Sequence, residues 1–230
     1  MLKILERGYE VEVKILEDVM KANDQIAEDN REMFTEKKMF VINLMSSPGS
    51  GKTTLLEKTF ETAENIKFGV IEGDVRTSLD GDRIARYNIP VVQIHTELFG
   101  GACHLDANMV KKAWKVFPQD TNIDLLFIEN IGNLVCPAGR SLGEDKNVVV
   151  LSVTEGEDKP AKYPLIFRLA HVLIINKIDL LPFLDINVNE IIKNAKAINP
   201  KIEIMELSAK TGEGLEKWIT WLEKKATTYK

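Results

Sequence analysis

Short apolar segments alternate with amphipathic segments along most of this chain. Runs this short, between charged flanks, are more typical of buried strands than of helices. The segments between them have the composition and length of helices, among them Thr54–Ala63, His104–Phe117 and Val188–Ile198. The alternation of strand and helix predicts an α/β fold with a mostly parallel central sheet and helices on both faces. The expected strands are Met39–Met45, which has Asn43 inside it, Phe68–Ile71, Val91–Ile94, Ile123–Ile128, Val148–Val153, Val172–Ile175 and Ile202–Met205.

The N-terminal stretch has a different pattern. From about Val11 to Phe34, apolar residues recur at a rough helical spacing among many charged ones, which predicts an amphipathic helix that lies on the rest of the molecule. No Ser- or Pro-rich linker, internal repeat or low-complexity tract divides the chain. We therefore expect one domain over residues 38–230, with an N-terminal helical extension over residues 1–37.

Composition excludes several classes of function. The 230 residues include 30 Lys and Arg against 35 Asp and Glu, which gives no broad basic surface for nucleic acid and no polybasic patch for a membrane. No apolar run reaches the roughly 18 residues of a membrane span, and early charges such as Lys3 and Arg7 are unlike a signal peptide. We expect a cytoplasmic protein. Its two cysteines, Cys103 and Cys136, exclude a disulfide framework and leave free thiols or metal ligands.

A glycine-rich segment follows the first expected strand and opens a helix, as in the phosphate-binding loop of P-loop NTPases. Its glycines let backbone N–H groups converge on phosphate oxygens, its lysine adds a point charge, and its threonine offers a hydroxyl to Mg²⁺. Ser46 stands where such loops usually begin with glycine. The alternative is a chance Gly-Ser turn. The predicted nucleotide contacts are Pro48, Gly49, Ser50, Gly51, Lys52, Thr53 and Thr54.

Two further segments predict which base is bound. Asn176-Lys177-Ile178-Asp179 and Ser208-Ala209-Lys210 each follow an expected strand, where ligands bind in parallel sheets. The Asp179 carboxylate can accept two hydrogen bonds from guanine, whereas adenine would leave it unpaired. The stem of Lys177 can cover the base, and the backbone around Ala209 can donate to the guanine oxygen. The predicted ligands are therefore GTP and GDP.

Acidic residues end two of the expected strands. Glu129 comes after Ile123–Ile128, and Gly132 follows it closely, so the acid can hold Mg²⁺ while the Gly132 N–H meets the γ-phosphate. Asp74 is the candidate second acid, a helix cap or turn being its alternative. We expect Lys52, Asp74, Glu129 and Gly132 to carry hydrolysis, and Thr53, Asp74 and Glu129 to hold Mg²⁺. Because no glutamine stands beside Gly132, turnover should be slow. Three arginines could assist it or lie on the surface: Arg76, Arg83 and Arg86.

Both cysteines lie close in sequence to these motifs. Cys103-His104 precedes an expected helix, and Cys136 follows Gly132. A thiol at a helix N-terminus has a depressed pKa, which favours the thiolate that soft and borderline metals bind. For each cysteine alone, an ordinary buried thiol is the alternative. His95 and His171 are expected to be core or edge histidines.

Taken together, these motifs resemble one family of P-loop NTPases in the SIMIBI class, the hydrogenase maturation GTPases HypB. The resemblance begins at about Met39 and rests on Ser47–Thr53, Glu72-Gly73-Asp74, Cys103-His104-Leu105, Glu129–Pro137 and Asn176–Asp179. It implies a three-layer P-loop fold over residues 38–230 and a GTP-binding domain with an embedded metal site.

The resemblance also implies a role. Members deliver nickel to [NiFe] hydrogenase, and their GTP-binding domains dimerise with GTP. The residues matching Cys103, His104 and Cys136 form a nickel or zinc site at the subunit interface. The implied partners are the metallochaperone HypA and, indirectly, the hydrogenase large-subunit precursor. Many members carry an N-terminal cysteine- or histidine-rich nickel motif, but no Cys or His precedes His95 here, so we expect metal transfer through the GTP-binding domain.

Three alternatives remain open. The urease accessory GTPase UreG shares the nucleotide loops, but typically places a proline between its Cys and His and lacks a counterpart of Cys136. A metal-binding protein without turnover is disfavoured by the intact Lys52, Thr53 and Asp179. A signalling or translation GTPase with incidental cysteines would bind no metal.

Overall fold

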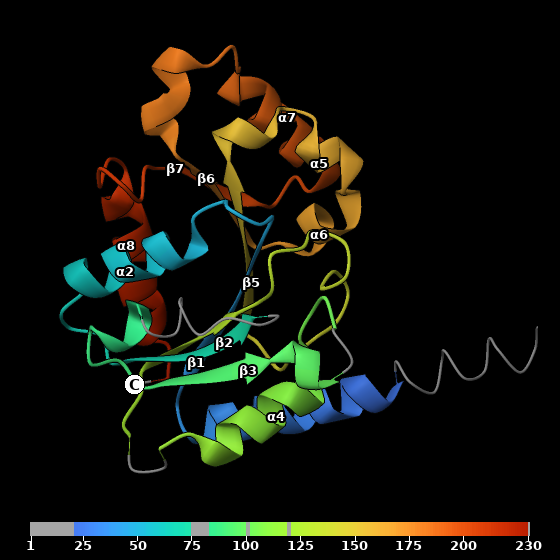
Figure 1. The fold of residues 1–230 in the computed structure, drawn as a ribbon, viewed down its shortest axis with the longest axis vertical. Helices are drawn as coiled ribbons and strands as arrows, with labels where there is room; N and C mark the ends of the chain where they lie inside the picture. The colour runs from blue at the N-terminus through green and yellow to red at the C-terminus, as the bar shows by residue number, and fades with distance from the viewer. Residues whose placement is uncertain (1–20, 75–82, 100–101, 119–120, 230) are drawn as a thin grey trace, which may run out of the picture.

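A parallel sheet runs through the whole molecule (Figure 1). The computed structural model describes residues 21–74, 83–99, 102–118 and 121–229. Within them, the strands pair in parallel in the order β3-β2-β4-β1-β5-β6-β7. Their bounds are β1 (Phe40–Ser46), β2 (Phe68–Asp74), β3 (Val91–His95), β4 (Leu125–Glu129), β5 (Lys146–Ser152), β6 (Val172–Asn176) and β7 (Glu203–Glu206). The predicted α/β fold is confirmed, and every expected strand is present within a few residues of its expected bounds.

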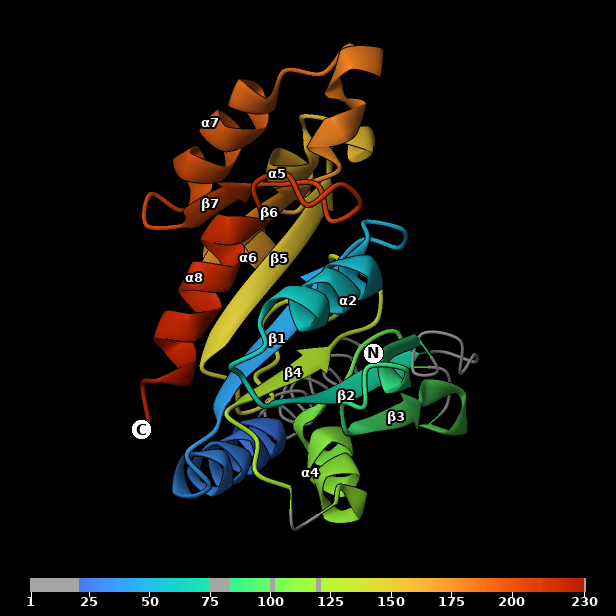
Figure 2. The same cartoon turned by 90° about the vertical axis from the view of Figure 1, so that its left-hand side faces the viewer.

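Helices cover both faces of this sheet, as expected. One face packs against α2 and α8, which Figure 2 shows in front of the strands. The opposite face packs against the helix of residues 21–36 and α4 on one half, and against α6 and α7 on the other. The helices are α2 (Lys52–Thr62), α4 (Ala107–Val116), α5 (Lys159–Lys162), α6 (Pro164–Leu169), α7 (Val188–Ile198) and α8 (Leu215–Ala226), with 3-10 turns η1 (Thr96–Phe99), η2 (Val153–Glu155) and η3 (Ile178–Phe183).

Strand β1 shows why this sheet is buried on both sides. All of its residues are buried, and successive side chains point to opposite faces. Phe40, Ile42 and Leu44 enter the core beneath α2 and α8, whereas Val41 enters the core beneath α4. A strand covered on both faces reads as a continuous apolar run, which is the pattern that the sequence predicted.

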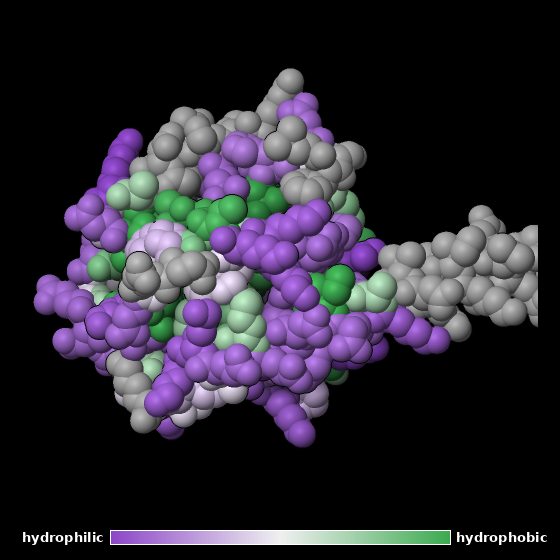
Figure 3. Space-filling model, turned by 90° about the horizontal axis from the view of Figure 1, so that it is seen from below, coloured by the Kyte–Doolittle hydropathy of each residue, from purple (hydrophilic) through white to green (hydrophobic). Residues whose placement is uncertain are grey.

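The N-terminal helix is fastened to the rest of the molecule by its own side chains. The expected helix began at about Val11, but residues 11–20 lie outside the described residues; residues 21–36 are helical. Phe34 is 1% exposed and packs edge-on against Trp114 of α4, with ring centroids 5.7 Å apart. Figure 3 shows that the surface over this end of the molecule is mostly hydrophilic, with smaller apolar areas. Among the described residues, no helix is long and apolar enough to cross a membrane.

Two amides on this helix bridge segments that are distant in sequence. The side chain of Asn23 accepts from the Ala107 N–H at 3.1 Å and donates to the Ser141 carbonyl at 3.0 Å. Asn30, fully buried, donates to the carbonyls of Ala107 at 2.9 Å and Leu142 at 3.0 Å. We call these bonds of Asn23 and Asn30 the amide clamp. They join the start of α4 to the loop before β5.

Candidate functional site: nucleotide groove and metal-ligand cluster

The phosphate-binding loop connects β1 to α2. Gly49 and Gly51 have φ angles of 73° and 95°, a region that favours glycine. A Cβ on Gly51 would stand 2.6 Å from Nδ2 of Asn176, so only glycine permits this close approach. Ser46, the departure from the usual pattern, is fully buried, and its Oγ accepts a 2.7 Å hydrogen bond from Nζ of Lys52. The serine therefore orients the lysine of this loop.

Asn176 at the end of β6 connects this loop to the two predicted base-binding segments. The side chain is 1% exposed and donates to the Ser50 carbonyl at 2.8 Å. Its Oδ1 accepts from the N–H groups of Lys177 at 2.8 Å and Ala209 at 2.9 Å. The Ala209 N–H is thus used within the protein.

Lys177 and Asp179, two of the residues predicted to contact the base, line one cavity. Lys177 has a φ of 66°, and its Nζ donates to the Gly49 carbonyl at 2.7 Å, so its side chain extends from the base-binding segment to the phosphate loop. Asp179 Oδ1 accepts a 2.6 Å hydrogen bond from Ser208 Oγ. This bond fixes the orientation of the carboxylate.

Two adjoining cavities lie along these loops. One, of about 560 Å³, is lined by the phosphate loop together with Asp74, Arg83, Glu129 and Gly132. The other, of about 270 Å³, is lined by Asn176, Lys177, Asp179, Ala209 and Lys210 among others. Both share Gly51, Thr54 and Lys177. The two cavities form one groove with a polar end and a more apolar end.

Acidic residues gather where β2 and β4 end in this groove. The Thr53 hydroxyl donates to Glu129 Oε1 at 3.1 Å. Asp74 ends β2 and lines the same cavity. Glu72, to which the sequence assigned no role, pairs in register with Glu129, and the two side chains are 2% and 4% exposed. The predicted Mg²⁺ residues therefore lie together, with a third acid beside them.

Gly132 and the arginines complete the polar end of the groove. A Cβ on Gly132 would lie 2.9 Å from backbone atoms of Pro48, so the loop after β4 lies directly on the phosphate loop. Arg83 lines the groove and binds Glu57, with its Nε 3.0 Å from Oε1. Arg86 is exposed, and Arg76 lies outside the described residues.

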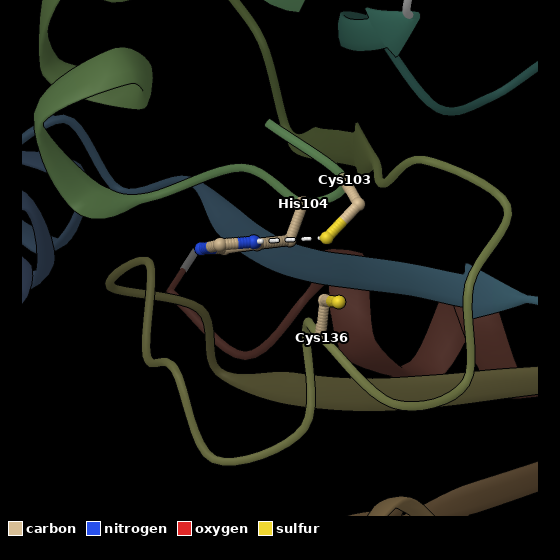
Figure 4. Close-up of side chains that lie close together, drawn as sticks. All are labelled: Cys103, His104 and Cys136. Atoms are coloured by element: carbon tan, nitrogen blue, oxygen red, sulfur yellow. Dashed lines mark hydrogen bonds between the residues drawn. The ribbon is translucent and has the colours of Figure 1, made fainter. Parts of the chain in front are cut away.

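The structure brings Cys103, His104 and Cys136 together. One ligand atom from each lies within 4.8 Å of the others. Figure 4 shows Cys103 and His104 on one segment facing Cys136 on another loop, and the Cys103 sulfur is 3.9 Å from His104 Nδ1. Cys103 is exposed, and the other two are partly buried. Two sulfurs and an imidazole nitrogen suit nickel or zinc.

The predicted acidity of the Cys103 thiol is wrong. Helix α4 begins only at Ala107, because Asp106 caps it by accepting from the Met109 N–H at 2.7 Å. Cys103 is therefore not at a helix N-terminus. The Cys136 thiol beside it and, to a smaller extent, burial raise the pKa of Cys103. Burial and the positive charge of Arg140 lower the pKa of His104, which favours the neutral imidazole that binds metals.

A parallel sheet, a phosphate loop and an Asn-Lys-x-Asp segment with its Asp in the groove together define a P-loop GTPase. The family described as CobW/HypB/UreG, nucleotide-binding domain, matches residues 40–206. Hydrogenase maturation factor HypB of Escherichia coli K12 is 49% identical over 218 residues, which are 94% of this chain and 72% of that protein. The chain belongs to the HypB family of hydrogenase maturation factors.

Solved structures agree with this assignment. HypB from Helicobacter pylori in complex with nickel is 39% identical, with a TM-score of 0.84 over 91% of this chain and 97% of that one. HypB from Archaeoglobus fulgidus is 41% identical, with a TM-score of 0.82 over 90% of this chain and 100% of that one.

Proposed function

We propose that this chain uses GTP binding and hydrolysis to control the uptake and release of nickel during hydrogenase maturation, and that it does so in the cytoplasm. One observation carries the proposal: Cys136 is on the loop that contains Gly132, and that loop lies against the phosphate loop. The ligand cluster and the groove therefore share one loop. The relatives support the cargo, since they include hydrogenase maturation factors and a HypB crystallised with nickel.

In this proposal, the apolar end of the groove selects guanine. Asp179, held by Ser208, accepts from the ring N–H and the amino group, and the stem of Lys177 covers the base. The Ala209 N–H donates to Asn176, so the backbone donor to the guanine oxygen comes from the adjacent Lys210.

The polar end is proposed to hold the phosphates and Mg²⁺. The hydroxyl of Thr53 and the carboxylates of Glu129 and Asp74 line one cavity, and such hard oxygen donors fit this cation. When bound, Mg²⁺ neutralises charge on the β- and γ-phosphate oxygens.

Hydrolysis is proposed to depend on charges and donors already in this end of the groove. Lys52 leaves Ser46 to meet the charge that develops as water attacks the γ-phosphorus and the bond to the β-phosphate oxygen breaks. The Gly132 N–H meets the γ-phosphate and moves when it departs.

The proposed cargo site is Cys103, His104 and Cys136. Nickel or zinc commonly takes four ligands in such N and S sites, and one chain offers three here. A second copy completes the coordination in a GTP-dependent homodimer, which is the symmetric way for one chain to share thiolates. The metallochaperone HypA is the proposed donor or acceptor of the ion, and the hydrogenase large-subunit precursor its indirect destination.

The test is calorimetric titration of nickel into the chain loaded with GDP and then with a non-hydrolysable GTP analogue, with mass measured in parallel. We expect different nickel affinities in the two states and a dimer with the analogue. Equal affinities in both states would refute the coupling. An absence of nickel binding in both would refute the cargo site.

A further inference from the structure

Asn130 lies where the loop carrying Gly132 leaves β4. Its side chain is 1% exposed. Oδ1 accepts from the N–H of Leu105 at 3.1 Å and from the N–H of Ile131 at 3.0 Å. Nδ2 donates to Asn43 Oδ1 at 3.2 Å. Every polar atom of this buried amide therefore has a partner, as buried polar groups require.

A row of amides holds Asn130 in this orientation. Asn43 of β1 receives the Asn130 bond and in turn donates to Asn147 Oδ1 of β5 at 3.1 Å. The three strands are neighbours in the order β4-β1-β5, so the row crosses the centre of the sheet. One end of the row, Asn147, lies within the sheet. The other end, Asn130, holds the backbone of the segment that contains Leu105.

That segment is the one with two of the proposed metal ligands. Leu105 directly follows Cys103 and His104 and is fully buried. Leu105 also packs against β2, because a Cβ on Gly73 would lie 2.8 Å from its side chain. Asn130 is therefore bonded to the ligand segment on one side, while the Gly132 loop, which begins with the next residue, carries Cys136.

We propose that Asn130 is a positioning residue that links the two ligand-bearing segments, so that a displacement of Gly132 by the nucleotide changes the spacing between Cys136 and the Cys103–His104 pair. The inference rests on the proposed function, since it requires that the cluster bind metal. Gly132 touches the phosphate loop. Asn130 fixes the first end of the loop that carries Gly132 and Cys136. Without the Leu105 bond, only the amide clamp still links the two segments, and the metal affinity follows the nucleotide less closely.

The main test compares Asn130→Ala with Asn130→Asp. Alanine removes all three bonds. Burial favours the protonated form of an aspartic acid at this position, whose carbonyl oxygen still accepts from both N–H groups while its hydroxyl donates to Asn43 Oδ1. The control is Asn199→Ala, which removes an amide bonded to three backbone carbonyls, those of Phe167, Arg168 and Ala170, none of which lines the groove or belongs to the ligand cluster.

The measured quantity is the ratio of nickel affinities between the GDP and GTP-analogue forms. We expect Asn130→Ala to reduce this ratio by about fivefold or more, within the usual range of coupling between sites. Asn130→Asp should restore most of it, and Asn199→Ala should leave it unchanged. Hydrogen exchange at the Leu105 N–H should quicken in Asn130→Ala and slow again in Asn130→Asp. If the alanine variant does not fold, Asn130→Ser, whose hydroxyl is too short to reach Leu105, replaces it.

Failure takes distinguishable forms. If the unaltered chain binds no nickel, the proposed function fails and takes this inference with it. If the unaltered chain shows the nucleotide-dependent ratio and Asn130→Ala retains it, the inference alone is wrong. Equal losses in Asn130→Ala and Asn199→Ala, or no recovery in Asn130→Asp, would show that Asn130 serves only stability.

Discussion

The nucleotide groove and the metal-ligand cluster are built in contrasting ways. In the groove, hydrogen bonds connect the loops directly, as Asn176 does to Ser50 and Ala209 and Lys177 does to Gly49. In the cluster, apart from the contact between the thiols of Cys103 and Cys136, the two ligand-bearing segments are held through residues that are not ligands, Asn130 and the amide clamp. The groove is therefore shaped in advance for its ligand. The spacing of the cluster is set by bonds outside the ligands, which suits the proposed uptake and release of an ion.

The largest effect that separates the two regions should come from Lys52→Ala. Its charge acts on the transition state of hydrolysis, so we expect kcat for GTP to fall by about 10²–10³, in the range for removal of one such group. Nickel affinity without nucleotide should not change. Lys58→Ala, on the same helix but paired with Glu61 outside the groove, is the control. Normal turnover in Lys52→Ala would show that Lys52 does not stabilise the transition state of hydrolysis.

Cys136→Ser should have the opposite effect: it should weaken nickel binding and leave nucleotide binding unchanged. Serine keeps the shape but is a poor ligand for nickel, so we expect nickel affinity to fall by more than the ~10–100-fold typical of an outer-shell partner. GDP affinity should stay the same, because Cys136 does not line the groove. Calorimetry with each ligand measures both effects. An unchanged nickel affinity would exclude Cys136 as a ligand.

A smaller effect is expected for Asp179→Asn. The amide still accepts from Ser208, but one of its guanine donors loses an acceptor, at about 1–3 kcal/mol. We expect GTP affinity to fall by about 5- to 150-fold, and xanthine nucleotides to gain, since their exocyclic oxygen suits the new donor. Competition binding measures the preference, and Asp185→Asn, at an exposed position, is the control. A preference for GTP as strong as before would contradict the guanine contact.

The smallest effect concerns stability near the clamp. Burial raises the pKa of Glu144, whose carboxylate accepts from the Leu142 N–H at 2.7 Å. A carboxyl with a raised pKa in the folded state binds protons that the unfolded state has already lost, so stability falls as pH rises through that folded pKa. Glu144→Gln, which can still accept from Leu142, should remove this part of the pH dependence and raise stability slightly at neutral pH. Urea unfolding at a series of pH values measures it, and a steeper loss of stability with pH in the variant would refute the assignment.

The same contrast explains what could be predicted from sequence. The strands were predictable because strands buried on both faces are continuous apolar runs, and the groove because its motifs are contiguous and follow strand ends. The convergence of Cys103 and His104 with Cys136 depends on tertiary structure, and for each cysteine alone the residues favoured an ordinary buried thiol. The prediction of a lowered pKa for Cys103 was wrong because it placed the start of the helix at His104, before the Asp106 cap.

The row of Asn130, Asn43 and Asn147 was even harder to predict from the sequence. Asn43 is visible as a polar residue inside an apolar run, which signals a buried partner. That the partner is Asn130, however, follows only from the order β4-β1-β5. No local pattern indicates which strands will be neighbours in a sheet.

The amide clamp joins segments that are made at different times. Its bonds connect residues 77 to 118 positions apart, and closing such long loops costs conformational entropy before any contact is gained. The helix of residues 21–36 is synthesised before Ala107 and Leu142 exist, yet it can be fastened only after both are in place. Until then, the clamp does not fix the spacing between the segments with Cys103 and Cys136. We therefore expect the complete cluster to form late in folding, after an ion that arrives during synthesis would have met the two thiols separately.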